Sequence, residues 1–516
     1  MKYYLTTTIP YVNAAPHLGH ALEFVQADVL ARNARKRLGA DNVYLLAGSD
    51  ENAIKNVQAA EAAGVPVAEF IERNSNIFRE LLKALNVSND DFVRTTEPRH
   101  IAGAQALWKA TNPADVYKKK YSGLYCTGCE LFYQPEELNE NGECFEHPGK
   151  KLEVVEEENW FFKLKNYEDW LKDIITNEDH PEHLRIVPET RRNEMLALIE
   201  RGLEDFSISR PVSRTKNWGV PVPGDEGQTM YVWYDALANY ITALGYPKTD
   251  GLYERFWSGN ENRGHILGKG VNRFHTIYWP AMLKSAGLPV PKFALVHGYI
   301  TIDGAKMSKS TGNVVDPTDI IKEYGTDALR FYLLHELSSR EDGDFSMEKM
   351  RVAYNAHLAN GLGNSVSRIL RLAVNDGVKL LDGDVMTLEE WMKVDPNAKR
   401  INDTIDSFDL SGALDLIIDT LKEEKSSSFE LPQYPGSGVS VPAGTVSIGS
   451  ISGSIQINQP YKEKDRTIKE AKIYRELLSL HRVALWLEIF MPATAVKIQQ
   501  SIKHLDMPET LFPRKA

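Results

Sequence analysis

Cysteine is scarce in this sequence, with three residues among 516, all of them between positions 126 and 144. An odd number confined to one short segment argues against a scaffold of disulfide bonds. The sequence also lacks an apolar run long enough to span a bilayer, and its first residues lack the layout of a signal peptide. We therefore expect a cytoplasmic protein without a membrane-spanning helix.

Positive charge is also in short supply, because 60 Lys and Arg residues stand against 71 Asp and Glu residues, a net charge of −11. Such a balance disfavours nucleic-acid binding over the whole surface. Nucleic acid needs only a local basic track, however, and the candidates are residues 32–37, residues 118–120 and the segment from residue 462 onward. The alternative, that these are ordinary solvated charges, stays open. The remaining composition is typical of a globular chain of about two to four domains.

A motif near the N-terminus combines a glycine with two histidines. Residues 3–8 are rich in β-formers and helical spacing follows residue 20, so the segment is predicted to be a strand, a Pro-containing turn and a helix. His17, Gly19 and His20 stand at the predicted helix start, where N–H groups and the helix dipole attract phosphate. Gly19 allows a base or ribose to approach, and the histidines can donate to a phosphoryl group. Taken alone, the histidines are better explained as helix caps or core partners.

A second motif, residues 304–313, is a loop of small and cationic residues that we call the lysine loop. Lys306 and Lys309 could reach the far side of a triphosphate, and the Gly and Ser residues would let the loop move. A solvated basic loop is the alternative when this motif is considered alone.

The first part of the chain alternates short β-like runs with helical runs. Strands are expected at 42–47 and 91–95, helices at 51–63 and 68–85, and a further strand at 292–297. This rhythm predicts βαβ units and a parallel sheet, in which ligands bind beyond the carboxyl ends of the strands. Asp50 lies at such an end, although by itself it is more simply explained as the N-cap of the next helix.

All three cysteines belong to one pattern of paired ligands. Cys126 and Cys129 have a two-residue gap, and so do Cys144 and His147. Two such pairs can present four ligands tetrahedrally to a structural zinc, with no position left open for chemistry. Three ordinary buried cysteines are the alternative.

The chain becomes helical from about residue 346, with helices expected over residues 350–374, 403–425 and 465–489. Asn364 and Arg368 are four residues apart and share a helix face, from which they could read base edges or simply form surface. Residues 426–457 interrupt this region, and no charge occurs from residue 431 to residue 461. Their period-two alternation favours a small β-like excursion, and a disordered linker is the alternative.

The motif His17-Leu18-Gly19-His20 and the lysine loop, about 290 residues later, together resemble the paired motifs of class I aminoacyl-tRNA synthetases. Four segments are similar to methionyl-tRNA synthetases: the cysteine–histidine segment 126–147, which we call the zinc knuckle, and segments 9–13, 231–236 and 297–310. This resemblance covers nearly the whole chain outside the insertion.

The resemblance implies an α/β fold with a Rossmann-like catalytic domain, a zinc-knuckle connective insertion and an α-helical anticodon-binding domain. The expected domains are residues 1–115 and 215–345 for the two catalytic halves, 116–214 for the insertion, and 346–516 for the helical domain, which contains 426–457. The chain ends without room for a further C-terminal domain, so a monomer is expected.

The implied activity is ATP-dependent ligation of L-methionine to tRNA(Met), with Mg²⁺ accompanying ATP and one structural Zn²⁺. The phosphates would meet His17, Gly19, His20, Lys306 and Lys309. The implied methionine pocket consists of Tyr11, Asp50, Trp233, Ala236, Tyr240 and His275, although the aromatic spacing from 233 to 240 also suits a core stripe. The implied anticodon readers are Asn364, Arg368 and Tyr461.

The sequence departs from the family pattern at several positions. Asn52 and Ala53 replace the usual His-Gly, Gly270 replaces a common acid, and Tyr461 replaces a stacking Trp. Two enzyme classes also stay open: a cysteinyl-type synthetase would hold zinc in its active site, and a nucleotidyltransferase would lack the helical half. A tRNA- or partner-binding relative without activity is the third alternative.

Overall fold

The computed structural model describes residues 1–126, 131–133, 135–145, 149, 151–306, 314–380, 385–423 and 466–515. Contacts divide the chain into two compact units. The first comprises Met1–Ile300, Lys306–Thr318 and Arg340–Gly343, and the second Thr301–Ala305, Asp319–Ser339 and Asp344–Ala516. The four predicted domain ranges stay predictions, and the predicted β-like excursion at 426–457 lies outside the described residues.

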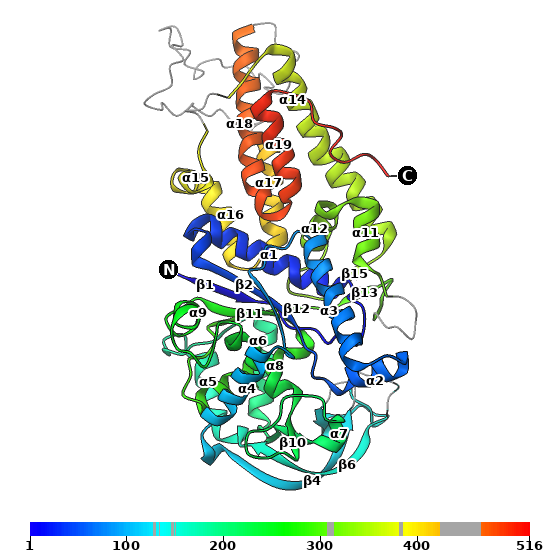
Figure 1. Ribbon diagram of the computed structural model, residues 1–516. Coiled ribbons are helices and arrows are strands. Elements are labelled where there is room, and N and C mark those ends of the chain that lie inside the picture. Colours follow the sequence, from blue (N-terminus) through cyan, green and yellow to red (C-terminus); the bar gives the residue numbers. More distant parts are fainter. Residues whose placement is uncertain are drawn as a thin grey trace. The chain divides into compact units, whose positions relative to one another are not determined.

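A six-stranded parallel sheet forms the centre of the first unit, in the order β3-β2-β1-β11-β12-β7 (Figure 1). Its strands are β1 (Tyr3–Thr6), β2 (Val43–Ser49), β3 (Asp91–Arg94), β7 (Arg185–Val187), β11 (Arg263–Gly268) and β12 (Phe293–His297). The parallel α/β core predicted from the sequence is therefore confirmed.

Helices cover both faces of this sheet. The connection from β1 to β2 runs through α1 (Leu18–Leu38), and the connection from β11 to β12 runs through α10 (Trp279–Ser285) in the opposite direction along the sheet. Because such crossovers are right-handed, these two helices lie on opposite faces. The other helices of this unit are α2 (Ile54–Ala63), α3 (Val67–Ala84), α4 (Pro98–Ala110), α5 (Glu168–Thr176), α6 (Glu189–Glu200), α7 (Val212–Thr215), α8 (Val232–Thr242) and α9 (Gly251–Tyr253).

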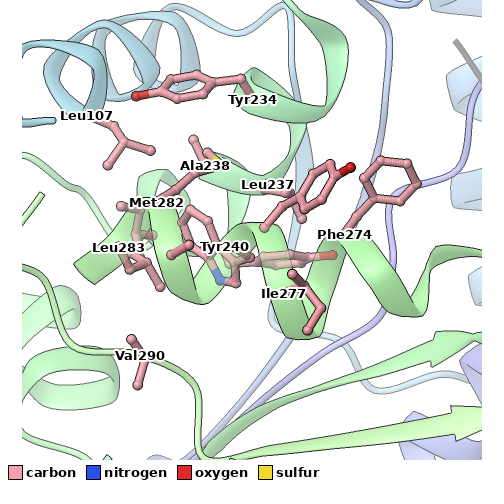
Figure 2. Close-up of a cluster of buried hydrophobic side chains, with 14 of the residues drawn as sticks. Leu107, Tyr234, Leu237, Ala238, Tyr240, Phe274, Ile277, Met282, Leu283 and Val290 are labelled. Carbon is pink, nitrogen blue, oxygen red and sulfur yellow. The ribbon is translucent and has the colours of Figure 1, made fainter. Parts of the chain in front are cut away.

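A large apolar cluster packs between α4, α8 and α10. Figure 2 shows Tyr240 among side chains of α8, of α10 and of the π-helical turn Phe274–Tyr278. Trp257 and Trp279 are fully buried in the same cluster. This packing fixes α8 and the π-helical turn against each other, and both carry residues of the expected methionine pocket.

An antiparallel sheet occupies the expected connective insertion, in the order β5-β4-β6-β8. Its strands are β4 (Val116–Cys126), β5 (Leu131–Tyr133), β6 (Glu153–Phe162) and β8 (Phe206–Ser207), and a separate pair joins β9 (Ser209–Pro211) to β10 (Gln228–Met230). Three short strands, β13 (Ile300–Ile302), β14 (Ala305–Lys306) and β15 (Gly343–Phe345), form a further sheet in which the chain passes from one unit to the other.

The second unit is mainly helical. Its helices are α11 (Pro317–Tyr324), α12 (Thr326–His335), α13 (Met347–Ala353), the π-helix η9 (Tyr354–Gly363), α14 (Asn364–Asp376), α15 (Leu388–Val394), α16 (Pro396–Asp406), α17 (Leu410–Glu423), α18 (Arg466–Phe490) and α19 (Pro492–His504). The expected single helix over 403–425 is wrong. Phe408 adopts a left-handed conformation with φ of 64°, and Asp409 accepts a hydrogen bond from Gly412 N, so one helix ends and another begins there.

Two buried side chains of α12 hold the corner between α18 and α19. Arg330 is fully buried and donates to the backbone carbonyls of Ile489 and Phe490, at the carboxyl end of α18. Asp327 accepts a hydrogen bond of 2.5 Å from Thr494 N, near the amino end of α19. Both charges oppose the dipole of the helix end that they meet, so they stabilise this corner. Among the described residues, no helix is long and apolar enough to cross a membrane.

Candidate active site

The order of strands reverses between β1 and β11 in the parallel sheet. Such a switch point leaves a crevice beyond the carboxyl ends of the strands, where α/β proteins bind ligands. The histidine motif follows β1, and residues 269–275 follow β11. Asp50 comes directly after β2 and pairs with Tyr11 in an isolated parallel bridge. Segments far apart in the sequence therefore meet at this point.

His17 and His20 cap the first helix reciprocally. His17 is the N-cap of α1, and its Nδ1 accepts a hydrogen bond of 3.1 Å from Gly19 N. In turn, Nδ1 of His20 accepts one of 3.1 Å from His17 N. Because both Nδ1 atoms are acceptors, the neutral rings carry their proton on Nε2. The expected capping role is confirmed, and it directs an Nε2–H donor of each ring away from the helix backbone.

The surroundings of His20 keep it neutral. Loss of solvation lowers the pKa of His20 well below its ordinary value, and the nearby His17 and His297 lower it further. Nε2 of His297 lies 3.0 Å from Oε2 of Glu23, whose Oε1 accepts hydrogen bonds from both the backbone and the hydroxyl of Thr8. Glu23 and His297 are both buried. A neutral His20 donor thus stands beside a buried histidine–carboxylate pair.

Aromatic rings surround the expected methionine pocket. Trp233 on α8 stacks on Phe274 with a centroid distance of 3.8 Å and an interplanar angle of 4°. The rings of Tyr11 and His275 each meet the Trp233 ring edge to face, both with a centroid distance of 6.2 Å. Ala236 is buried one turn further along α8. The expected core role of the aromatic spacing from 233 to 240 is confirmed, because Tyr240 is part of the buried cluster and Trp233 packs against it.

Tyr240 and His275 form a directed pair. Nδ1 of His275 lies 2.9 Å from the carbonyl oxygen of Val271, so it carries a proton and Nε2 is an acceptor. The hydroxyl of Tyr240 lies 2.6 Å from Nε2 and donates to it. Burial lowers the pKa of His275 to about 4, so the ring is neutral near pH 7 and its two hydrogen bonds set the tautomer. In this arrangement the single Tyr240 proton points at His275, while the hydroxyl oxygen keeps its acceptor capacity.

Asp50 is almost fully buried beside the strand ends. The expectation that it caps the next helix is wrong, because the N-cap of α2 is Ala53. Its Oδ1 instead accepts a hydrogen bond from Asn52 N. The Asn52 side chain donates to Asp235 Oδ2 at 2.9 Å and to the carbonyl of Thr95 at 3.1 Å. Asn52, a departure from the family pattern, thus ties the loop after β2 to α8, which also carries Trp233 and Ala236 of the expected methionine pocket.

Sequence reasoning missed three residues at this site. Lys55 on α2 places Nζ 3.6 Å from the centroid of the Tyr11 ring. Phe274 forms the stacked partner of Trp233, and Glu23 pairs with His297. Position in the chain gave some signal for Phe274, which adjoins His275, and for Glu23, which lies one turn after His20. Lys55 lacked such a signal, because its ring partner Tyr11 is distant in the sequence.

Gly270 has a steric neighbour that accounts for its lack of a side chain. A Cβ atom at this position would collide with the hydroxyl of Tyr299. Tyr299 is held in place by a hydrogen bond of 2.9 Å from its backbone N–H to Asp342, which also pairs with Lys269 at 2.7 Å. The tyrosine hydroxyl therefore takes the space that an acidic side chain at residue 270 would need.

The other predicted ligands lie partly outside the described residues. Lys306 ends β14, after a turn in which Asp303 and Gly304 have positive φ values of 49° and 77°. The predictions for Lys309 and for the Lys306 side chain lie outside the described residues, as do those for Cys129, His147 and Tyr461. Sγ atoms of Cys126 and Cys144 are buried and 3.2 Å apart.

Asn364 and Arg368 both lie on α14 in the helical unit. Asn364 is the first residue of the helix and is exposed. Arg368 is half-buried, and its Nη1 contacts both carboxylate oxygens of Glu476 at 3.0 and 3.2 Å. The two residues share a helix face as predicted, and Arg368 is already oriented by an ion pair.

Comparison with known proteins identifies the family of this chain. A family model described as tRNA synthetases class I (M) matches residues 3–370. The chain belongs to this family. Methionine–tRNA ligase of Brucella suis biovar 1 is 45% identical over 374 residues, which cover 72% of this chain and 70% of that one. Methionine–tRNA ligase of Thermotoga maritima is 40% identical over 428 residues, 81% of this chain and 66% of that one.

Solved structures of the same family agree with the fold. Mycobacterium tuberculosis methionyl-tRNA synthetase bound by methionyl-adenylate matches with a TM-score of 0.80 and 32% identity, over 100% of this chain and 99% of that one. The free form of the same enzyme matches with a TM-score of 0.74 and 29% identity, again over 100% of this chain and 99% of that one. The class I tRNA synthetase predicted from the paired motifs is thus confirmed as the family.

Proposed function

We infer that this protein is an ATP-dependent methionine–tRNA ligase, which forms methionyl-adenylate and then transfers the methionyl group to tRNA(Met). Membership of the class I tRNA synthetases (M) supports this activity, and so do the methionine–tRNA ligases at 40–45% identity. The observation that carries the assignment of the site is the reciprocal capping of His17 and His20 at the switch point of the sheet. It presents two ring donors at a helix N-terminus, a place that attracts phosphate.

In the first step, a carboxylate oxygen of methionine attacks the α-phosphorus of ATP. A P–O bond forms, and the bond to the β-phosphate oxygen breaks to release pyrophosphate. Negative charge grows on the phosphoryl oxygens, where Nε2–H of His17 and His20 would donate. Lys306 and Lys309 would neutralise the leaving pyrophosphate. The protein needs no covalent nucleophile, because its contribution is to align two anions and stabilise the charge between them.

The substrate side chain would lie against the aromatic wall. Trp233, Tyr11 and Ala236 provide an apolar surface that suits a thioether. Tyr240 and His275 would set the depth of the pocket through their mutual hydrogen bond. The buried carboxylate of Asp50 would pair with the substrate ammonium. Lys55, on the Tyr11 ring, adds a positive charge for the substrate carboxylate.

Two metal ions accompany this proposal. Mg²⁺ would enter with ATP and neutralise its phosphates. A structural Zn²⁺ would be held by Cys126, Cys129, Cys144 and His147. Two thiolates on one tetrahedral zinc stand about 3.8 Å apart. The buried sulfurs of Cys126 and Cys144, 3.2 Å apart, would therefore fit a zinc ion after moving slightly away from each other.

The second step would transfer the methionyl group to the 3′ ribose of the tRNA. The anticodon of this tRNA would contact Asn364, Arg368 and Tyr461. We expect the protein to act as a monomer.

Methionine-dependent exchange of pyrophosphate into ATP tests this proposal. The wild type should catalyse exchange with methionine but not with cysteine, whereas a cysteinyl-type enzyme would show the reverse. A nucleotidyltransferase or an inactive relative would show no exchange with either amino acid. Lys309→Ala should lower exchange about 10²–10³-fold, as expected when one preorganised donor to developing charge is lost, with methionine affinity unchanged. Near-normal exchange in Lys309→Ala would contradict the role of the lysine loop.

A further inference from the structure

A cluster of two histidines and two carboxylates lies in the helical unit, apart from every residue assigned above. His335 is the last residue of α12, and Glu336 follows it. His357 comes from the π-helix η9, and Asp415 from α17. One ligand atom each of His335, Glu336 and His357 lies within 4.8 Å of the others. The fold thus brings together, from separate helices, groups that bind metal ions well.

The separations within the cluster suit ligands of one ion. Nδ1 of His335 is 2.7 Å from Glu336 Oε1, and Nε2 of His357 is 3.5 Å from the same oxygen. Two ligands about 2.1 Å from a tetrahedral ion stand about 3.4 Å apart, which these two values bracket. The His335 and His357 rings have centroids 4.9 Å apart, and Phe331 stacks on His335 at 4.7 Å. The side chain of His357 is 45% exposed, so its ring has room to adjust.

Asp415 orients His335 in the way that metal-binding histidines are oriented. Nε2 of His335 lies 3.0 Å from Asp415 Oδ1, so this nitrogen donates to the carboxylate. A ligating histidine almost always donates its second N–H to a carboxylate or carbonyl, which fixes the ring and raises its basicity. Nδ1 is then directed at the space shared with Glu336 and His357. The carboxyl end of α12 also favours a cation, because the helix dipole is negative there.

We propose that His335, Glu336 and His357 bind a first-row divalent transition metal ion of the Zn²⁺ type, with Asp415 as the positioning residue of His335. Imidazole and carboxylate ligands together suit Zn²⁺, Co²⁺ and Ni²⁺ rather than Mg²⁺ or Ca²⁺. The ion takes the place of a proton on Nδ1 of His335, and water completes its coordination on the exposed side. It joins α12 to η9 directly and to α17 through Asp415, so binding stabilises the helical unit.

Titration of the full-length protein with Co²⁺ tests this site while the cysteine-containing site keeps its zinc. The protein is first dialysed against a weak chelator, and bound metal is counted before and after titration. The wild type should take up one further ion per chain. Its absorption should show weak d–d bands without the intense charge-transfer band of thiolate ligands, which separates this site from the zinc knuckle. An excess of Zn²⁺ should raise the Tm by about 2–4 °C, and the increase should grow with the logarithm of the free Zn²⁺ concentration.

Three variants decide the outcome. His357→Ala removes an exposed ligand without disturbing the core, and should abolish both the extra ion and the Tm shift. Asp415→Asn should weaken Co²⁺ binding about 10–100-fold, the usual cost of losing an outer partner. His504→Ala, which removes an exposed histidine of the same unit, should bind like the wild type. Equal Co²⁺ binding by wild type and His357→Ala overturns the proposal, and so does the absence of an extra ion at 100-fold excess of Co²⁺, which would leave the cluster as an ion-pair network only.

Discussion

The hydroxyl of Tyr240 donates a hydrogen bond of 2.6 Å to Nε2 of His275, and both side chains are buried. The direction is set by Val271, whose carbonyl oxygen accepts the Nδ1 proton of His275 at 2.9 Å. Two side chains that are 35 residues apart therefore form one unit, in which the tyrosine oxygen can still accept a hydrogen bond.

Removing this hydroxyl should weaken methionine recognition selectively. Tyr240→Phe removes the group that orients His275, so the contacts of this pair with bound methionine, about 1–3 kcal/mol for buried polar groups, would be lost. We expect kcat/KM for methionine in pyrophosphate exchange to fall about 5- to 150-fold, while the KM for ATP stays the same. Tyr4→Phe is the matched control, because the Tyr4 hydroxyl donates to the backbone carbonyl of Tyr240 at 2.7 Å. An equal loss in both variants would contradict a specific role for the Tyr240 hydroxyl.

The buried histidines should make stability depend on pH. Burial lowers the pKa of His275 to about 4, whereas an unfolded histidine titrates near 6.5. Between these values the unfolded state binds more protons, so stability falls as the pH falls, by up to about 1.4 kcal/mol per pH unit. His275→Gln should reduce the loss between pH 7 and pH 5 by about 2 kcal/mol relative to wild type.

Urea unfolding of the parallel-sheet unit at the two pH values measures this effect. Tyr4→Phe removes no histidine and should keep the wild-type dependence on pH. The same pH dependence in His275→Gln as in wild type would show that this histidine is not kept neutral in the folded protein.

His17 performs two tasks that one substitution can separate. As an N-cap it accepts from Gly19 N through Nδ1, and it would donate to phosphate through Nε2. His17→Asn keeps an efficient N-cap but removes the donor. We expect an unchanged Tm and adenylate formation about 10²–10³-fold slower. His17→Ala should lose the same activity and in addition about 1 kcal/mol of stability. If His17→Asn exchanges pyrophosphate normally, capping is the whole function of this residue.

Local sequence patterns predicted the features that depend on neighbouring residues. Alternation of strands and helices identified β1, α1 and β2, and the paired histidines and lysines identified the family. Pairings between distant positions were not predictable, because no local pattern encodes them. The tertiary fold brings Glu23 to His297 and Asn52 to Asp235. The break at Phe408 was missed for another reason, since a non-glycine residue with positive φ gives no signal in an otherwise helical composition.

The zinc knuckle should hold one tightly bound ion per chain. Cys126 and Cys144 bring their sulfurs together in a buried position, and metal analysis after dialysis against a chelator counts the ion. Cys126→Ala should lose zinc and destabilise the insertion. His147→Cys should keep zinc, because four thiolates suit tetrahedral coordination equally well, whereas His147→Ala should lose it. Zinc retained by a Cys126→Ala/Cys144→Ala double variant would contradict the assignment.

Arg368 offers a test of anticodon reading, because Glu476 already fixes its position on α14. The guanidinium contacts both carboxylate oxygens at 3.0 and 3.2 Å, and a planar fork held in this way can present its other N–H groups to a base edge. Arg368→Lys keeps the charge but loses the fork. A bidentate contact to a base is worth about 1–3 kcal/mol, so kcat/KM for tRNA charging should fall about 5- to 150-fold, with pyrophosphate exchange unchanged.

Two further variants separate positioning from charge. Glu476→Gln keeps the shape of the partner and weakens the hold on Arg368, so it should lower charging less than Arg368→Lys does. Asn364→Ala, one turn away on the same exposed face, should also lower charging while sparing exchange. A partly exposed ion pair contributes only about 0–1 kcal/mol to stability, so the Tm of Glu476→Gln should stay close to that of wild type, and a change in charging cannot then be attributed to unfolding. Wild-type charging by both Arg368→Lys and Asn364→Ala would place anticodon reading elsewhere in the helical unit.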